Sequence, residues 1–96
     1  MNWKIFITPT GLDCLKSIRD KDEVAFARIK KAIDKLADNP VGNGIKLSSP
    51  LSNFWRTRAG NYRIIYTIEN ELVTVTVIYA GHRKEVYSRL KKYLSR

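Results

Sequence analysis

"FWRTRAGNYRIIYTIENELVTVTVIYAG", residues 54–81, is the stretch that decides the fold. It is rich in β-branched and aromatic residues, and short polar segments at 59–61 and 69–71 interrupt it. Strand-forming runs separated by such short turns predict β-hairpins. We therefore expect three consecutive antiparallel strands, which cover residues 54–58, 62–68 and 72–80.

Alternation along the two longer strands predicts which face of the sheet is buried, because successive side chains point to opposite faces. One face collects more apolar residues, namely Tyr62, Ile64, Tyr66 and Ile68 in the middle strand and Val73, Val75, Val77 and Tyr79 in the last. We expect this face to pack on helices. Arg63 should then point to the opposite, more open face.

The residues before the sheet predict one strand and two helices. Residues 2–9, "NWKIFITP", carry apolar groups on both faces and predict a mostly buried strand. Thr8 or Thr10 is expected to cap a first helix, with Leu12, Leu15 and Ile18 on its inner side. A second helix is expected to begin at Asp22 and to end in "DNPVGNG". The short polar turn between them indicates a helical hairpin.

A short basic helix is expected from about residue 84 to the end of the chain. The predicted order is therefore β-α-α-β-β-β-short α. This is an α+β fold in which an antiparallel sheet of about four strands packs on an N-terminal helical hairpin. With 96 residues, we expect a single domain that covers 1–96.

Charge is the first clue to function. Lysine and arginine together number 18 against 9 acidic residues, a formal net charge of +9. Such a field favours polyanions, such as nucleic acid or the ribosome, or an acidic protein. The simpler interpretation is a basic protein with no such partner. No run approaches the ~18 apolar residues of a membrane span, and no secretory signal is evident, so we expect a cytoplasmic protein without membrane contact.

Basic residues should gather at one edge of the sheet. Arg56 and Arg58 share one face of a strand, and Arg63 begins the next strand just past a turn. The last strand runs back toward Arg63, so the segment that follows it should arrive at the same edge. The residues expected there are Arg56, Arg58, Arg63, His82, Arg83, Lys84 and Tyr87.

These residue types suit the cleavage of RNA without a metal. Guanidinium groups match phosphate oxygens bidentately. The 2′-hydroxyl must lose a proton, and the leaving 5′-oxygen must gain one. A histidine titrates near neutrality and can serve either transfer, and a tyrosine can act as a base only where cations favour its phenolate. The sequence has no P-loop, dinucleotide fingerprint or metal-ligand spacing, so we expect neither metal nor cofactor.

Simpler interpretations apply to each of these residues. A lone histidine in a turn, here His82, is usually solvent-facing and inactive. Arg56 and Arg58 could form an ordinary solvated strand face. Tyr87 could belong to the core, because its position suits the inner side of the last helix.

Residues 54–87, ending in "GHRKEVY", resemble the RelE/ParE superfamily of type II toxin–antitoxin toxins, and its RelE-like mRNA interferase branch in particular. The strand–helix–helix opening and the "DNP…KL" passage occur in the family's order, so the resemblance covers nearly the whole chain. It implies a toxin that acts as a ribosome-dependent, metal-independent endoribonuclease and cleaves mRNA in the A site. The implied partners are a RelB-like antitoxin, mRNA and the ribosome, and the toxin–antitoxin complex is expected to bind operator DNA through the antitoxin.

The resemblance also implies roles for residues. Arg63 would contact the scissile phosphate, and Arg83 would stabilise the transition state or protonate the leaving oxygen. Tyr87 would activate the 2′-hydroxyl, with His82 as the alternative base. The residues expected to bind the RNA backbone are Arg56, Arg58 and Lys84.

The competing hypothesis is a ParE-like inhibitor of DNA gyrase that does not cleave RNA. Its fold would be the same, and fold does not decide function. Gyrase-directed members largely lack the basic and aromatic site that this chain carries, which favours RNA cleavage.

Overall fold

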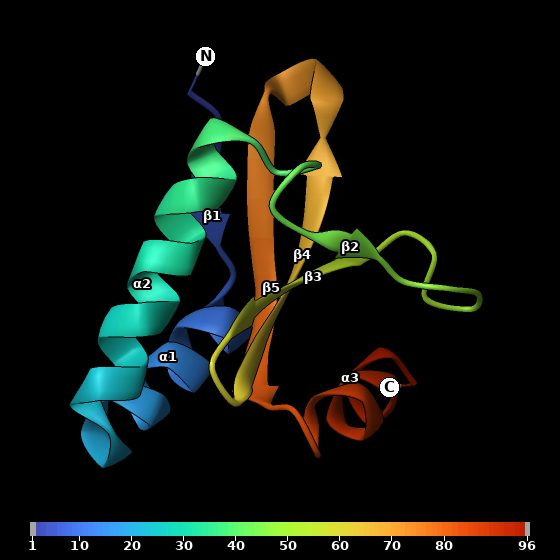
Figure 1. Cartoon of the computed structure of the whole chain (residues 1–96). Coiled ribbons are helices and arrows are strands. Elements are labelled where there is room, and N and C mark those ends of the chain that lie inside the picture. Colours follow the sequence, from blue (N-terminus) through green and yellow to red (C-terminus); the bar gives the residue numbers. More distant parts are fainter. Residues whose placement is uncertain (1, 96) are drawn as a thin grey trace.

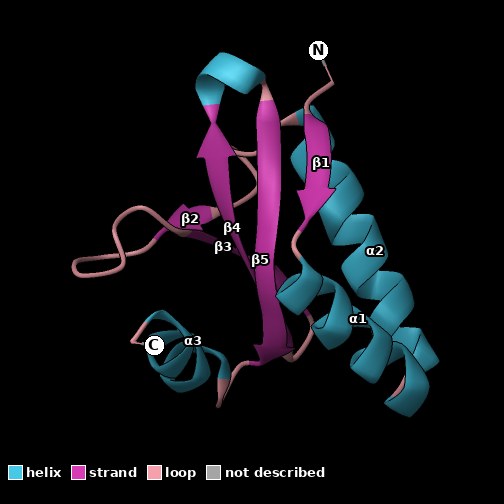
Figure 2. Ribbon diagram, turned by 180° about the vertical axis from the view of Figure 1, so that it is seen from behind, coloured by secondary structure: helices cyan, strands magenta, loops and turns pink. Residues whose placement is uncertain are grey.

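A five-stranded sheet separates two helical layers in the computed structural model, which describes residues 2–95 (Figure 1). The elements, in chain order, are β1 (Lys4–Ile7), α1 (Pro9–Lys21), α2 (Glu23–Asp38), β2 (Ile45–Lys46), β3 (Trp55–Ala59), β4 (Tyr62–Glu69), a 3₁₀ turn (Asn70–Leu72), β5 (Thr74–His82) and α3 (Val86–Leu94). The strands lie in the order β1-β5-β4-β3-β2. Helices α1 and α2 cover one face, and α3 lies on the other (Figure 2).

The predicted α+β architecture is confirmed, with two corrections to the sheet. The segment Ile45–Lys46 pairs with β3 and adds a fifth strand. Strand β1 pairs in parallel with β5, so the sheet is mixed rather than antiparallel. The prediction of a mostly buried first strand is wrong, because β1 lies at the edge of the sheet and leaves Phe6 55% exposed.

A short polar side chain caps the N-terminus of each helix of the hairpin. The Thr8 hydroxyl accepts a hydrogen bond from the Gly11 N–H at the start of α1, and the Asp22 carboxylate accepts one from the Ala25 N–H at the start of α2. The predicted cap of the first helix is thus confirmed for Thr8, and the second helix begins at Asp22 as expected, with Asp22 as its cap. Leu12 was expected on the inner side of α1 but is 42% exposed. The apolar layer between hairpin and sheet centres on Leu15, Ile18, Ile29, Ile33, Ile64 and Val77.

A β-bulge in β5 changes which residues share a face. Tyr66 pairs with Val77, but Ile65 pairs with Tyr79, so Ile78 is an extra residue in the ladder. Val77 therefore faces the helical hairpin, whereas Tyr79 packs beside Ile65 in the cluster that contains α3. The prediction that Tyr79 shares a face with Val77 is wrong for this reason.

Helix α3 is held on the far face of the sheet by a small second core. Val86 and Leu90 of α3 are fully buried against Ile65, and Leu51 completes the cluster from the segment between β2 and β3. The face that was expected to be open is thus covered in part. Among residues 2–95, no helix has both the length and the apolar character needed to cross a membrane.

Candidate active site

Three arginines share the sheet face on which α3 lies. The β3–β4 register places Arg58 directly opposite Arg63 and Arg56 opposite Ile65. Opposed side chains in an antiparallel ladder lie on the same face, and Ile65 contacts the α3 cluster. The tight turn between the strands uses Gly60 with φ of 60°, a conformation that favours glycine. The predicted grouping of Arg56, Arg58 and Arg63 is therefore confirmed as geometry.

Arg63 is the fixed centre of this group. Its side chain is 9% exposed, and its Nη1 donates hydrogen bonds of 3.1 Å to the carbonyl oxygens of Gly60 and Tyr62. Burial lowers the pKa of Arg63, and the charges of neighbouring arginines lower it further, while Tyr87 opposes this effect. The arginines that act in this way are Arg58, Arg56 and Arg83. The structure thus brings five of the predicted site residues together.

Arg83 and Tyr87 reach the site from the segment that follows β5. The Arg83 N–H donates a 2.7 Å hydrogen bond to the Asn61 carbonyl, which ties this segment to the β3–β4 turn. The Arg83 side chain is exposed, and Tyr87 lies half-buried in the first turn of α3, against the core cluster of Val86 and Leu90. Tyr87 is therefore both a packing residue and a neighbour of Arg63. Lys84 lies in the exposed turn before α3.

His82 lies on the other side of the sheet from Arg63. It pairs with Tyr62, and the two rings meet edge to face with their centroids 5.8 Å apart. Tyr62 packs against the core under the helical hairpin. The bulge explains this placement. If the pairing of Tyr66 with Val77 continued without an extra residue, Ala80 would lie opposite Arg63, and His82 would share the face of Arg63. With the extra Ile78, Gly81 is opposite Arg63 instead. The expectation that His82 joins the arginine group is therefore wrong.

The arginine group has no acidic partner within the described residues. The ion pairs found there join Arg19 to Asp20 and Arg89 to Glu85, both at exposed positions, and none of the arginines of the group takes part in them. Like charges repel, so an uncompensated cluster of this kind stores electrostatic energy that an anion would relieve. Across residues 2–95 there is also no group of three His, Cys, Asp or Glu side chains placed to hold a metal ion. Such a group of arginines beside one tyrosine has the chemistry to bind a phosphate.

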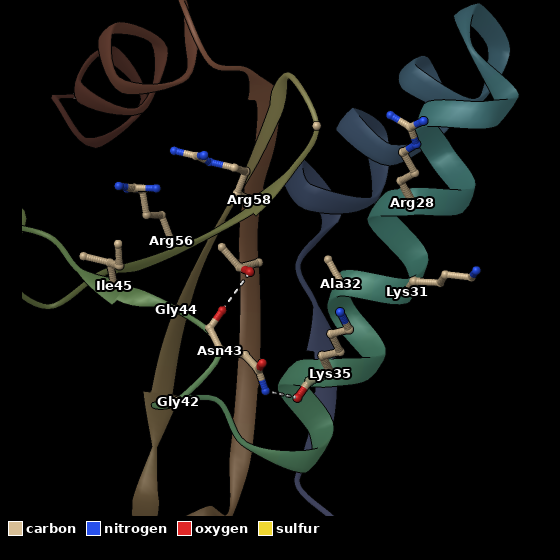
Figure 3. A pocket seen from close by; sticks show the side chains of 12 residues that line it. Arg28, Lys31, Ala32, Lys35, Gly42, Asn43, Gly44, Ile45, Arg56 and Arg58 are labelled. Carbon is tan, nitrogen blue, oxygen red and sulfur yellow. Dashed lines mark hydrogen bonds between the residues drawn. The ribbon is translucent and has the colours of Figure 1, made fainter.

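A second basic region, a groove between α2 and β3, did not emerge from the sequence as a site (Figure 3). Its volume is about 780 Å³, and three cations of α2, Arg28, Lys31 and Lys35, line it. In the sequence these three cations are spaced i, i+3, i+7 on the solvent side of a predicted helix. An ordinary solvated helix face has the same spacing, so the sequence did not identify them as a site. Only the strand opposite makes this face a groove, which we call the α2 groove.

Comparison with known proteins places the chain in a family. Residues 5–87 match the model of the ParE toxin of the type II toxin-antitoxin system parDE. This chain belongs to that family. It is also 32% identical over 66 residues to Toxin RelG of Mycobacterium tuberculosis, an alignment that covers 69% of this chain and 76% of the relative. The chain is therefore a type II toxin of the RelE/ParE superfamily, and the resemblance seen in the sequence is confirmed.

Solved structures show the same fold. The toxin–antitoxin complex RelBE2 of Mycobacterium tuberculosis contains a chain that superposes with a TM-score of 0.77 at 24% identity, over 85% of this chain and 99% of that one. A mutant of the E. coli toxin RelE in the free state superposes with a TM-score of 0.67 at 25% identity, over 97% of this chain and 98% of that one. The RelE-like order of elements is thus confirmed for this family member.

Proposed function

We propose that this toxin is a metal-independent, ribosome-dependent endoribonuclease that cuts mRNA in the A site. The observation that carries the proposal is the gathering of Arg83 and Tyr87 beside Arg56, Arg58 and Arg63 on the sheet, with none of the arginines paired to a carboxylate within residues 2–95. Fixed cations placed where charge develops are among the largest contributions to catalysis. In RNA cleavage the phosphorane carries its charge on two non-bridging oxygens, which guanidinium groups can bind bidentately.

The proposed reaction is a transesterification. The 2′-oxygen forms a bond to phosphorus as the bond from phosphorus to the 5′-oxygen breaks, which leaves a 2′,3′-cyclic phosphate and a 5′-hydroxyl. Arg63, held by two backbone carbonyls, binds the scissile phosphate. Tyr87 takes the 2′ proton, because His82 lies on the other face of the sheet. Arg83 stabilises the charge on the leaving oxygen or delivers its proton.

Binding of the rest of the substrate falls to neighbouring cations. Arg56 and Arg58 lie on the same face as Arg63 and would contact the RNA backbone, and Lys84 would add to them from the exposed turn. We further propose a RelB-like antitoxin as the partner, since the similar structures include the complexes RelBE2, archaeal RelE–RelB and E. coli RelBE. The toxin–antitoxin complex would bind operator DNA through the antitoxin, in the cytoplasm.

Inhibition of DNA gyrase is the second candidate, and the match to the ParE family model favours it. The two candidate functions differ in their targets, which are translated mRNA for the endoribonuclease and DNA gyrase for the inhibitor. Induction of the toxin alone, followed by mapping of RNA 5′ ends during translation, should show cuts phased with codons. Arg83→Ala should reduce this cleavage by about 100-fold or more, as expected for the loss of one electrostatic stabiliser. DNA breaks and inhibited supercoiling without phased cuts would instead establish the gyrase inhibitor.

A further inference from the structure

The α2 groove is a built feature rather than a gap between side chains. Asn43 holds its two walls together: the Asn43 amide donates a 3.0 Å hydrogen bond to the Lys35 carbonyl at the end of α2, and its backbone carbonyl accepts one of 2.8 Å from the Thr57 hydroxyl of β3. These bonds are drawn in Figure 3. The distance between the α2 cations and the strand is therefore set by the fold.

The cations of the groove have no counter-charge. None of the described residues that line it is acidic, and the ion pairs within residues 2–95 lie elsewhere, at Arg19–Asp20 and Arg89–Glu85. Lys31 and Lys35 are spaced i, i+4, where like charges destabilise a helix. A helix that keeps this arrangement along one wall of a groove presents a site for an anion.

The groove is continuous with the active site through the β3–β4 turn. A side chain on Gly60 would begin 3.5 Å from the Nη1 of Arg28. The carbonyl of the same Gly60 accepts a hydrogen bond from Arg63. One glycine thus lies between Arg28 of α2 and the central arginine of the site, and Arg56 and Arg58 of β3 also line the groove. From Arg28 to Lys35 the cations span about 10 Å along the helix axis, comparable to about three nucleotides of a strand.

We infer that the α2 groove is a second binding site for an RNA phosphate backbone, outside the scissile site. This rests on the proposed function for the identity of the polyanion. An acidic amphipathic peptide would fit less well, because the groove offers few apolar side chains beyond Ala32 and Ile45. The separate groove between α1 and α2 has accessible apolar side chains of the kind that such a peptide needs, including Leu12 and Phe26. The RNA could be single-stranded sequence next to the cut or structured RNA of the ribosome.

A binding assay tests the inference without relying on cleavage. The probes are a short mixed-sequence RNA with 2′-O-methyl riboses throughout, which cannot be cut, and vacant ribosomes. The variant is Arg28→Gln/Lys31→Gln/Lys35→Gln. The matched control is Lys16→Gln/Arg19→Gln/Lys30→Gln, which removes the same charge from the rim of the α1–α2 groove. A third variant, Lys31→Arg/Lys35→Arg, keeps the charge and should keep the affinity.

The α2 variant should bind at least about tenfold more weakly, and its slope of log affinity against log salt should fall by about two to three. The control should change affinity by less than about twofold. Weaker binding to the short RNA alone indicates single-stranded RNA, weaker binding to ribosomes alone indicates structured RNA, and weaker binding to both indicates that the groove accepts either. Equal losses in the two triple variants, or loss of binding only to an acidic peptide, would overturn the inference.

If the wild type cleaves translated mRNA but the variants bind RNA as tightly as the wild type, the groove assignment alone fails. If the wild type binds neither probe and cuts no RNA, the proposed function fails with it.

Discussion

Arg58 and Arg63 stand directly opposite each other across the β3–β4 ladder, on the face that carries the candidate site. Like charges placed this way destabilise a sheet, and the charge of Arg58 is the largest electrostatic cause of the lowered pKa of Arg63 after burial. The fold therefore holds a repulsive pair at the position where a phosphate would bind between the two groups.

Removal of Arg58 should consequently stabilise the protein while it weakens function. Arg58→Gln is expected to raise the free energy of unfolding by about 0.5–1 kcal/mol at low salt, with less gain at high salt because salt screens the repulsion. The matched control is Arg89→Gln, which breaks an i, i+4 pair with Glu85 and should cost about 0.2–0.5 kcal/mol. Urea titrations at two salt concentrations measure both. Destabilisation by Arg58→Gln at low salt would mean that the pair is not repulsive.

His82 and Tyr87 give opposite predictions for cleavage of translated mRNA. Tyr87→Phe keeps the packing against α3 but removes the hydroxyl, so the cleavage rate should fall by about 100-fold. His82→Gln should change that rate by less than about threefold, because the ring lies against Tyr62 on the other face. Single-turnover cleavage with saturating toxin measures the rate. A large loss for His82→Gln with a small one for Tyr87→Phe would reverse our assignment of the base.

The sequence predicted the features that depend on neighbouring residues. The hairpin between β3 and β4 follows from its short turn and alternating strands, so the grouping of Arg56, Arg58 and Arg63 could be expected. The bulge at Ile78 could not be expected from the sequence, because it depends on contacts between residues far apart in the chain. The extra residue lets Tyr79 join Ile65 in the core beneath α3. The placement of His82 depends on that bulge. The α2 groove likewise depends on the bond from Thr57 to Asn43, fourteen positions away in the chain.

Gly44 should tolerate no side chain. An added Cβ would overlap the hydroxyl of Tyr66 and lie 2.9 Å from the carbonyl oxygen of Arg56. Because the obstacle includes backbone, Gly44→Ala should destabilise the protein by about 1–3 kcal/mol. Gly81→Ala is the matched control, since its Cβ would meet its nearest neighbour, the Tyr79 ring, at an ordinary 3.5 Å. Thermal unfolding of the two variants compares them, and equal midpoints would show that the 42–44 loop can move aside.

Tyr66 should make the fold sensitive to alkaline pH. Its side chain is fully buried, its hydroxyl donates a 2.7 Å hydrogen bond to the Pro40 carbonyl, and burial raises its pKa to about 12. An unfolded tyrosine has a pKa of about 10, so the folded state favours the neutral phenol. The stabilisation that this preference gives the folded state is fully present below pH ~10 and is lost as the pH rises through about 12. It amounts to at most about 2–3 kcal/mol.

The variant Tyr66→Phe separates this effect from the titration of lysines and other tyrosines. At pH 7 the variant should be less stable than the wild type by about 1–2 kcal/mol, because the buried Pro40 carbonyl loses its donor. Above pH 10 the wild type should lose stability faster than the variant, since phenylalanine has no proton to release. Urea titrations at pH 7, 9, 10.5 and 11.5 would measure the difference between the two proteins. A difference that stays constant with pH would mean that the Tyr66 phenol ionises as readily in the folded as in the unfolded chain.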